Sequence, residues 1–224
     1  MSYPAKELYS IHDAGRNLDH TGREFLSIEL SLDGFSYCVL DTDSFRYVLL
    51  ESFAIANNTD YALLADVIVE SGKSKNILNR DYQRVSISLI SQLITFIPAD
   101  LYTFSEKGDY IDFNVRPDAA HEIKVDKLNN LGAYAIYPYP RVLLQKIDKL
   151  FPNARIRHAA TSLVENLIYM ARYSQVKMQL VLHVQANHFE IVIFDQDKLS
   201  FYNSFRYQTV DDLFYYLFFV LEHL

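Results

Sequence analysis

The stretch FLSIELSLDGFSYCVL, residues 25–40, is the part of the sequence that decides the fold. Apolar and polar residues alternate over Phe25–Leu32, as they do in a strand with one buried face. Asp33-Gly34 has the composition of a two-residue hairpin turn, and Phe35–Leu40 supplies the returning strand. The stretch therefore predicts an antiparallel β-hairpin.

The flanking residues extend this hairpin into a larger unit. Phe45–Phe53 predicts a third strand. The segment after it predicts a helix between a cap at Thr59 or Asp60 and an end at Gly72. Residues 1–24 are mostly polar and predict an irregular N-terminal arm.

A second copy of the unit begins near Met178. It consists of a strand at Leu180–Val184, a turn at Asn187-His188, a returning strand at Phe189–Phe194, and a helix with Thr209 as its cap and Asp212 in its first turn. A constant offset of 154 residues (189 − 35) relates Phe35 to Phe189, Asp41 to Asp195 and Asp43 to Asp197. The pattern indicates an internal duplication. The alternative is two unrelated runs of antiparallel strands, each leading into a helix.

The residues between the two copies predict an insertion and a continuation of the first unit. The predicted elements are a strand at Ala133–Pro138, a helix from Pro140 to Leu150, a strand at Ala154–His158 and a helix at Thr161–Tyr173. The predicted domains are the arm at 1–24, a first half at 25–82 and 127–176, a small β-rich insertion at 83–126, and a second half at 177–224.

Composition excludes several classes of protein. The 224 residues carry a formal charge of −7, which gives no general attraction to nucleic acid or to anionic lipid. Cys38 is the only cysteine, so an intramolecular disulfide and a cysteine-based zinc site are excluded. The N-terminus lacks the apolar core of a signal peptide, and no apolar run is long enough for a membrane span. We therefore expect a cytoplasmic protein.

The order of predicted elements resembles a ribonuclease-H-like unit, and its duplication resembles the actin-like ATPase superfamily. Ala133–Pro140 and the helix after it look like the fourth strand and second helix of that superfamily. Phe96–Tyr102, together with Leu150-Phe151-Pro152 and His158, resembles an uncharacterised bacterial family, the domain of unknown function numbered 3822. The resemblance implies an α/β fold of duplicated ribonuclease-H-like units with mixed sheets and a small β-rich insertion. It implies no established activity.

The end of the sequence departs from this pattern. A complete second half would need a further strand, helix, strand and helix after residue 224. We expect either that roughly 30 to 60 residues follow or that a partner covers the open face. The apolar helix over residues 211–224 favours a protein partner or self-association.

The two hairpins stand where actin-like proteins hold phosphates, so the resemblance gives candidate cofactor-binding positions. These are Glu29, Ser31, Asp33 and Gly34 in the first hairpin, and Gln185 and Asn187 in the second. The second hairpin has neither the glycine nor the carboxylate that the superfamily uses, and no glycine follows Gly132. We therefore expect a catalytically degenerate actin-like protein, a pseudo-ATPase without a cofactor, that acts as an interaction or scaffold module and is not an enzyme.

Two catalytic alternatives remain open. One is a nucleotide-binding ATPase or phosphotransferase that uses Glu29 and Ser31. The other, less favoured, is a metal-dependent nuclease with Glu29 and Asp41 or Asp43 as ligands. His183 and His188 flank one hairpin at a spacing that would permit a shared metal, but ordinary strand and turn histidines are favoured, so no metal site is predicted.

Overall fold

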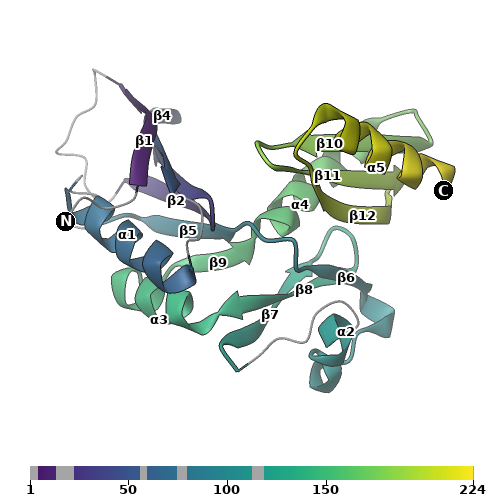
Figure 1. Ribbon diagram of the computed structural model, residues 1–224, viewed down its shortest axis with the longest axis horizontal. Coiled ribbons are helices and arrows are strands. Elements are labelled where there is room, and N and C mark those ends of the chain that lie inside the picture. Colours follow the sequence, from purple (N-terminus) through teal and green to yellow (C-terminus); the bar gives the residue numbers. More distant parts are fainter. Residues whose placement is uncertain (1–4, 14–22, 56–59, 75–79, 113–118, 224) are drawn as a thin grey trace.

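The computed structural model describes residues 5–13, 23–55, 60–74, 80–112 and 119–223. These residues form three β-sheets and their helices (Figure 1). The strands are β1 (Ala5–His12), β2 (Glu24–Ser31), β3 (Gly34–Asp41), β4 (Arg46–Ile55), β5 (Arg84–Leu89), β6 (Thr95–Pro98), β7 (His121–Leu128), β8 (Ala133–Pro140), β9 (Arg155–His158), β10 (Met178–Val184), β11 (His188–Asp195) and β12 (Lys198–Arg206). The helices are α1 (Tyr61–Ser74), α2 (Asp109–Asp112), α3 (Arg141–Leu150), α4 (Ala159–Tyr173) and α5 (Val210–Glu222), with short 3₁₀ turns at Ala99–Leu101 and Phe104–Glu106.

The largest sheet has the strand order β1-β4-β3-β2-β5-β9. The first four strands are antiparallel, whereas β5 and β9 run parallel to β2. One face carries the alternating residues Leu26, Ile28 and Leu30, which pack with α1 and α3 in a single hydrophobic core. The predicted period-two alternation therefore sets which face of this mixed sheet is buried.

The N-terminal prediction needs correction. Ala5–His12 is not irregular, because it forms β1 and pairs antiparallel with β4. Its side chains are largely exposed, so its pattern lacks the apolar alternation that marks a half-buried strand. The backbone of β4 supplies the pairing instead.

The β-rich sheet predicted at 83–126 lies further along the chain, because one predicted strand belongs to the main sheet and another joins the small sheet instead. Arg84–Leu89 belongs to the main sheet as β5, next to β2. Ala133–Pro140 is not the fourth strand of that sheet, because β8 is the central strand of a separate three-stranded sheet, β6-β8-β7. Strand pairing decides to which sheet β5 and β8 each belong, and hydrophobic periodicity along the sequence does not reveal which strands pair.

The predicted helices form with adjusted ends. Asp60 accepts a hydrogen bond from the Leu63 amide as a helix cap, and α1 continues through Gly72 to Ser74. The alternative cap, Thr59, lies outside the described residues. The side chains of Thr209 and Asp212 form a reciprocal capping box at the start of α5, as predicted.

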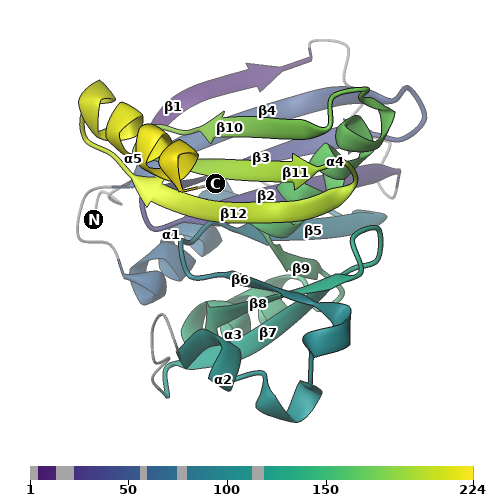
Figure 2. The ribbon, with the colours of Figure 1, turned by 90° about the vertical axis from the view of Figure 1, so that its right-hand side faces the viewer.

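The third sheet, β10-β11-β12, repeats the order of three antiparallel strands followed by a helix. Helix α5 packs on one face of it, around Phe189, Ile191 and Ile193. The other face packs with the insertion sheet in a common core that contains Val164 and Ile168 of α4. The two small sheets therefore lie side by side on one helix, with β12 next to β6 (Figure 2).

Candidate functional site

The two predicted hairpin turns meet in the folded protein. The side-chain amide of Asn187 donates a hydrogen bond of 2.5 Å to Asp33 Oδ2. The two residues are 154 positions apart, the same separation as between Phe35 and Phe189. The two turns thus form a direct contact between the main sheet and the sheet β10-β11-β12.

The first turn uses its own polar groups internally. Ser31 pairs with Gly34 across the strands, so the turn residues are Leu32 and Asp33 rather than the predicted Asp33-Gly34. The Ser31 hydroxyl donates to the Gly34 carbonyl at 3.2 Å and accepts from the Asp33 amide at 3.3 Å. Gly34 has a packing role, because a Cβ atom there would overlap the backbone carbonyl oxygen of Phe53.

The second turn is held by Tyr207, a residue that the sequence analysis did not single out. Its hydroxyl donates to the Gln185 carbonyl at 2.5 Å, and its amide donates to the Asn187 carbonyl at 3.1 Å. His188 Nδ1 lies 2.9 Å from Asn187 Oδ1, and since that oxygen can only accept, the imidazole carries a proton on Nδ1. Burial lowers the pKa of His188.

The strands that flank the second turn carry a cluster of charged side chains, centred on His183 of β10 and Glu190 of β11. His183 Nδ1 is 2.5 Å from Glu190 Oε2, and the Tyr202 hydroxyl donates to Glu190 Oε1 at 3.3 Å. This hydrogen bond to the carboxylate raises the pKa of His183. The surrounding protein displaces water from the Glu29 carboxyl and thereby raises its pKa, although the residue as a whole stays exposed. The charge of His183 lowers the pKa of Glu29, and the charge of Glu190 raises it further.

Glu29 lies in a band of serines. Its register partners are Ser36 on β3 and Ser88 on β5, and the next position on the same face brings Ser27 beside Ser86. These residues face away from the α1 and α3 core. The alternation around Phe25–Leu32 marks this polar face in the sequence, but the neighbouring serines emerge only from strand pairing.

The proposed nuclease ligands are not brought together. Asp41 pairs with Glu24, five strand positions from the Ser36 partner of Glu29. At about 3.4 Å per residue this separates them by roughly 17 Å, whereas two catalytic metals lie about 4 Å apart. Asp41 Oδ1 accepts from the amides of Asp43 and Ser44, which is a turn-forming role. Among the described residues, no three His, Cys, Asp or Glu side chains are grouped so that they could hold a metal ion.

A second buried polar cluster surrounds the start of α4. Asp126 accepts hydrogen bonds from the His158 amide at 3.0 Å, the Thr161 hydroxyl at 2.8 Å and the Tyr137 hydroxyl at 3.1 Å. His158 Nδ1 accepts from the Ala160 amide at 3.1 Å, so its Nε2 is the protonated atom and donates to Ser91 at 3.2 Å. An imidazole in this tautomer cannot remove a proton from that serine.

Complete burial lowers the pKa of His158 to about 3, which keeps the ring neutral. The cluster therefore joins β7, β8, β9 and α4 to the segment that follows β5. The sequence contains all five residues, but nothing in their spacing places them together.

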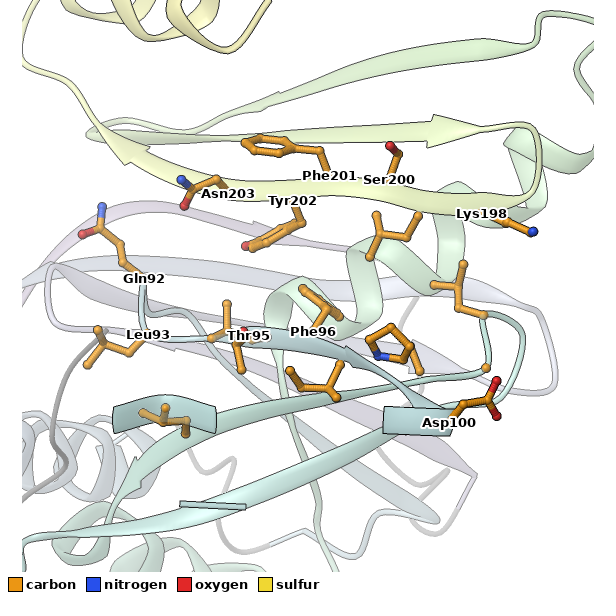
Figure 3. Close-up of a pocket in the computed structure, with 18 residues that line it drawn as sticks. Gln92, Leu93, Thr95, Phe96, Asp100, Lys198, Ser200, Phe201, Tyr202 and Asn203 are labelled. Atoms are coloured by element: carbon orange, nitrogen blue, oxygen red, sulfur yellow. The ribbon is translucent and has the colours of Figure 1, made fainter. Parts of the chain in front are cut away.

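A cavity of about 830 Å³ lies between β6 and β12 (Figure 3) and adjoins the Glu190 cluster at Tyr202. Its lining includes Thr95, Phe96, Leu199, Tyr202 and Asn203. None of the predicted site residues lines it. In the part of the chain that the structure describes, no helix is both long and apolar enough to cross a membrane.

Solved structures share this fold. A protein of unknown function with an actin-like ATPase fold from Bacteroides thetaiotaomicron is 21% identical, with a TM-score of 0.82 over 91% of this chain and 77% of its own. A PilM–PilN type IV pilus biogenesis complex contains a chain that is 11% identical, with a TM-score of 0.51 over 81% of this chain and 61% of its own.

No curated protein matches the sequence significantly. Residues 13–224 match the family described as "Protein of unknown function (DUF3822)". The resemblance drawn from the sequence is confirmed, and so is the α/β class with an actin-like ATPase fold. The chain belongs to the DUF3822 family.

Proposed function

We propose that this protein is an interaction module that keeps the actin-like architecture without turning over nucleotide. The hydrogen bond between Asp33 and Asn187 carries the proposal. A phosphate held between two hairpin turns needs backbone amides that point at it, but here the turn side chains contact each other and the Asp33 amide already bonds Ser31.

Charge at the turns supports the same function. Asp33, Glu29 and Glu190 bring three carboxyl groups to this region. His183 is bonded to Glu190, and Arg206 lies opposite His188 on β12, at the edge of the second turn. A triphosphate would meet like charge from the carboxylates, and each such contact opposes binding.

Exposed apolar side chains support an interaction role. On α5, Phe214, Phe218 and Phe219 are each about half exposed. In the main sheet the equivalent helix α1 packs against α3, and the β2 edge pairs with β5. Among the described residues, neither α5 nor the β10 edge has such a cover. A protein partner or a second copy of the chain fits this surface.

Calorimetry with ATP and Mg²⁺, combined with a phosphate-release assay, tests the proposal. We expect no saturable binding at micromolar nucleotide and no steady release of phosphate. Micromolar affinity or sustained release would contradict it and favour the ATPase or phosphotransferase alternative. In that case Glu29→Gln should abolish release while the protein remains folded.

A further inference from the structure

Two strands with free edges lie next to each other across the 830 Å³ cavity. β12 hydrogen-bonds to β11 on one side, and β6 hydrogen-bonds to β8 on one side. Within the described residues, neither strand has a partner at its other edge, and these two edges are the ones that line the cavity. Unpaired edges present rows of amide and carbonyl groups that pair with another strand.

Both edges lie in the same layer. Val192, Phe194 and Tyr202 of the sheet β10-β11-β12 and Phe96 and Ala135 of the insertion sheet belong to one core, which they share with Val164 and Ile168 of α4. The views in Figures 1 and 2 agree that β12 and β6 are neighbours. A strand between them would join the two small sheets into one continuous sheet over α4.

Side chains, and not backbone hydrogen bonds, link the two strands at present. Phe96 and Tyr202 both point into the space between the strands (Figure 3), and their rings meet edge to face with centroids 4.9 Å apart. Neighbouring strands in a sheet are only about 4.8 Å apart, backbone to backbone. The cavity of about 830 Å³ that both strands line supplies the space for one further backbone beside this ring pair.

We propose that the space between β6 and β12 binds an extended segment of a partner protein, which adds a strand to both edges at once. The Phe96–Tyr202 pair lies beneath it, together with Ile94 and Leu199, so the segment carries apolar side chains at alternate positions. This inference deepens the proposed interaction function and rests on it.

Two local features limit the length of the slot. β6 ends at Pro98, which has no amide hydrogen to donate. On β12, Leu199 pairs with Phe194 and Phe201 with Ile193, so Ser200 is a bulge that interrupts the regular edge. Regular pairing therefore covers Thr95–Ile97 on β6 and runs from Phe201 to Arg206 on β12. The parts that line the cavity are Thr95–Ile97 and Phe201–Asn203, which suits a segment of about four to six residues.

The first experiment measures binding of a fluorescein-labelled peptide, TVTVTV with blocked ends, by fluorescence polarisation. Two control peptides have the same side chains but carry N-methyl groups on alternate residues, one set on the odd and the other on the even positions. Successive amides of a strand point to opposite sides, so a peptide between two edges uses both rows. We expect each methylated peptide to bind at least about tenfold more weakly. Full affinity of either one would show pairing with a single edge and would overturn the proposal, as would the absence of binding at 1 mM TVTVTV.

The second experiment locates the peptide. Hydrogen exchange of the unmodified protein should slow at Thr95–Ile97 and Phe201–Asn203 when the TVTVTV peptide is added, and should stay unchanged in β1 and β10. Because the chain has no tryptophan, Phe96→Trp provides a single reporter in the slot, with Phe214→Trp on α5 as the matched control. Emission should shift on peptide binding only in the Phe96 variant.

The outcomes also separate this inference from the function on which it rests. Protection of β6 and β12 that rises with protein concentration, without peptide, would assign the slot to a second copy and overturn the proposal. Protection of β10 instead would locate binding elsewhere and leave the interaction function intact. Nucleotide turnover is measured independently of either result.

Discussion

Asn187 shows how much depends on one side chain at the junction of the two hairpins. Its Nδ2 donates to Asp33 Oδ2, and its Oδ1 accepts from His188. The amide thus satisfies a carboxylate on one sheet and an imidazole on the next strand. An isosteric carboxylate could accept from His188 but could not donate to Asp33.

We therefore expect Asn187→Asp to separate the two turns. Two carboxylates at hydrogen-bonding distance repel each other, so the variant should unfold at lower urea concentration than the wild type. The control Asn187→Ala removes both side-chain hydrogen bonds without adding a charge, and should cost about 1–2 kcal/mol, less than Asn187→Asp. Because salt screens exposed charges, 1 M NaCl should reduce the difference between the two variants. Equal stability of both variants at low salt would count against a direct contact between the turns.

His158 predicts a dependence of stability on pH. Its pKa is about 3 in the folded protein and about 6.5 in the unfolded chain, so between these values the unfolded state binds the extra proton. The stability that the neutral ring contributes is complete above pH 6.5 and is lost as the pH falls. The slope from this residue is about 1.4 kcal/mol per pH unit.

Urea unfolding of wild type and His158→Gln at several pH values between 5 and 6.5 isolates that slope. Glutamine does not titrate, so the difference in stability between the two proteins should shrink as the pH is lowered. His183 contributes with the opposite sign, because its pKa is raised and its contribution is lost as the pH rises, but it is present in both proteins. A difference that stays constant with pH would mean that the ring of His158 is accessible to protons.

At the scale of elements, β3 and β4 approach each other so closely that only glycine fits at position 34. Gly34→Ala would place a Cβ against the Phe53 carbonyl, which is backbone and cannot rotate away. We expect a loss of about 1–3 kcal/mol, as for other overpacked sites. Gly108→Ala is the matched control, because no atom lies within 4 Å of the added Cβ. The urea concentrations at the unfolding midpoint measure the stability of both variants. Equal midpoints would refute the explanation that a side chain at position 34 clashes with the Phe53 carbonyl.

Elements with their own periodicity could be predicted from the sequence. The hairpin of β2 and β3, helices α3 and α4, and the capping box of α5 all form where local pattern places them. The local sequence pattern did not predict strands whose place in a sheet depends on the neighbouring strand. β1 is held by pairing with β4, and the alternation in β5 is the same whether its neighbour is β2 or an insertion strand.

The candidate site was predictable only in part, for the same reason. The resemblance to actin-like proteins gave Asp33 and Asn187 as candidate positions, and these two residues do come together. Their direct contact, the Glu190 partner of His183 and the role of Tyr207 depend on how two sheets are placed in space. No spacing within one strand contains that information.

At the scale of the whole molecule, α4 is the element on which separate parts of the chain converge. It follows β9 of the main sheet, and its buried residues pack against both the insertion sheet and the sheet β10-β11-β12. α1 and α3, in contrast, belong to a core with the main sheet. A defect in α4 should therefore loosen two sheets that are not hydrogen-bonded to each other.

Ile168 is fully buried in the α4 core, and Leu64 is fully buried in the α1 core. Ile168→Ala should cost about 2–5 kcal/mol and should raise hydrogen-exchange rates in β8 and β11 together, with a smaller effect in β3. Leu64→Ala removes a side chain of similar volume from the other core and should affect β3 most and β11 least. β8 should respond to both variants, because its Tyr137 and Tyr139 also belong to the Leu64 core. Native-state hydrogen exchange measures all three strands in one experiment. If Ile168→Ala loosened β11 and left β8 protected, the two small sheets would be independent units, and α4 would not couple the insertion to the C-terminal sheet.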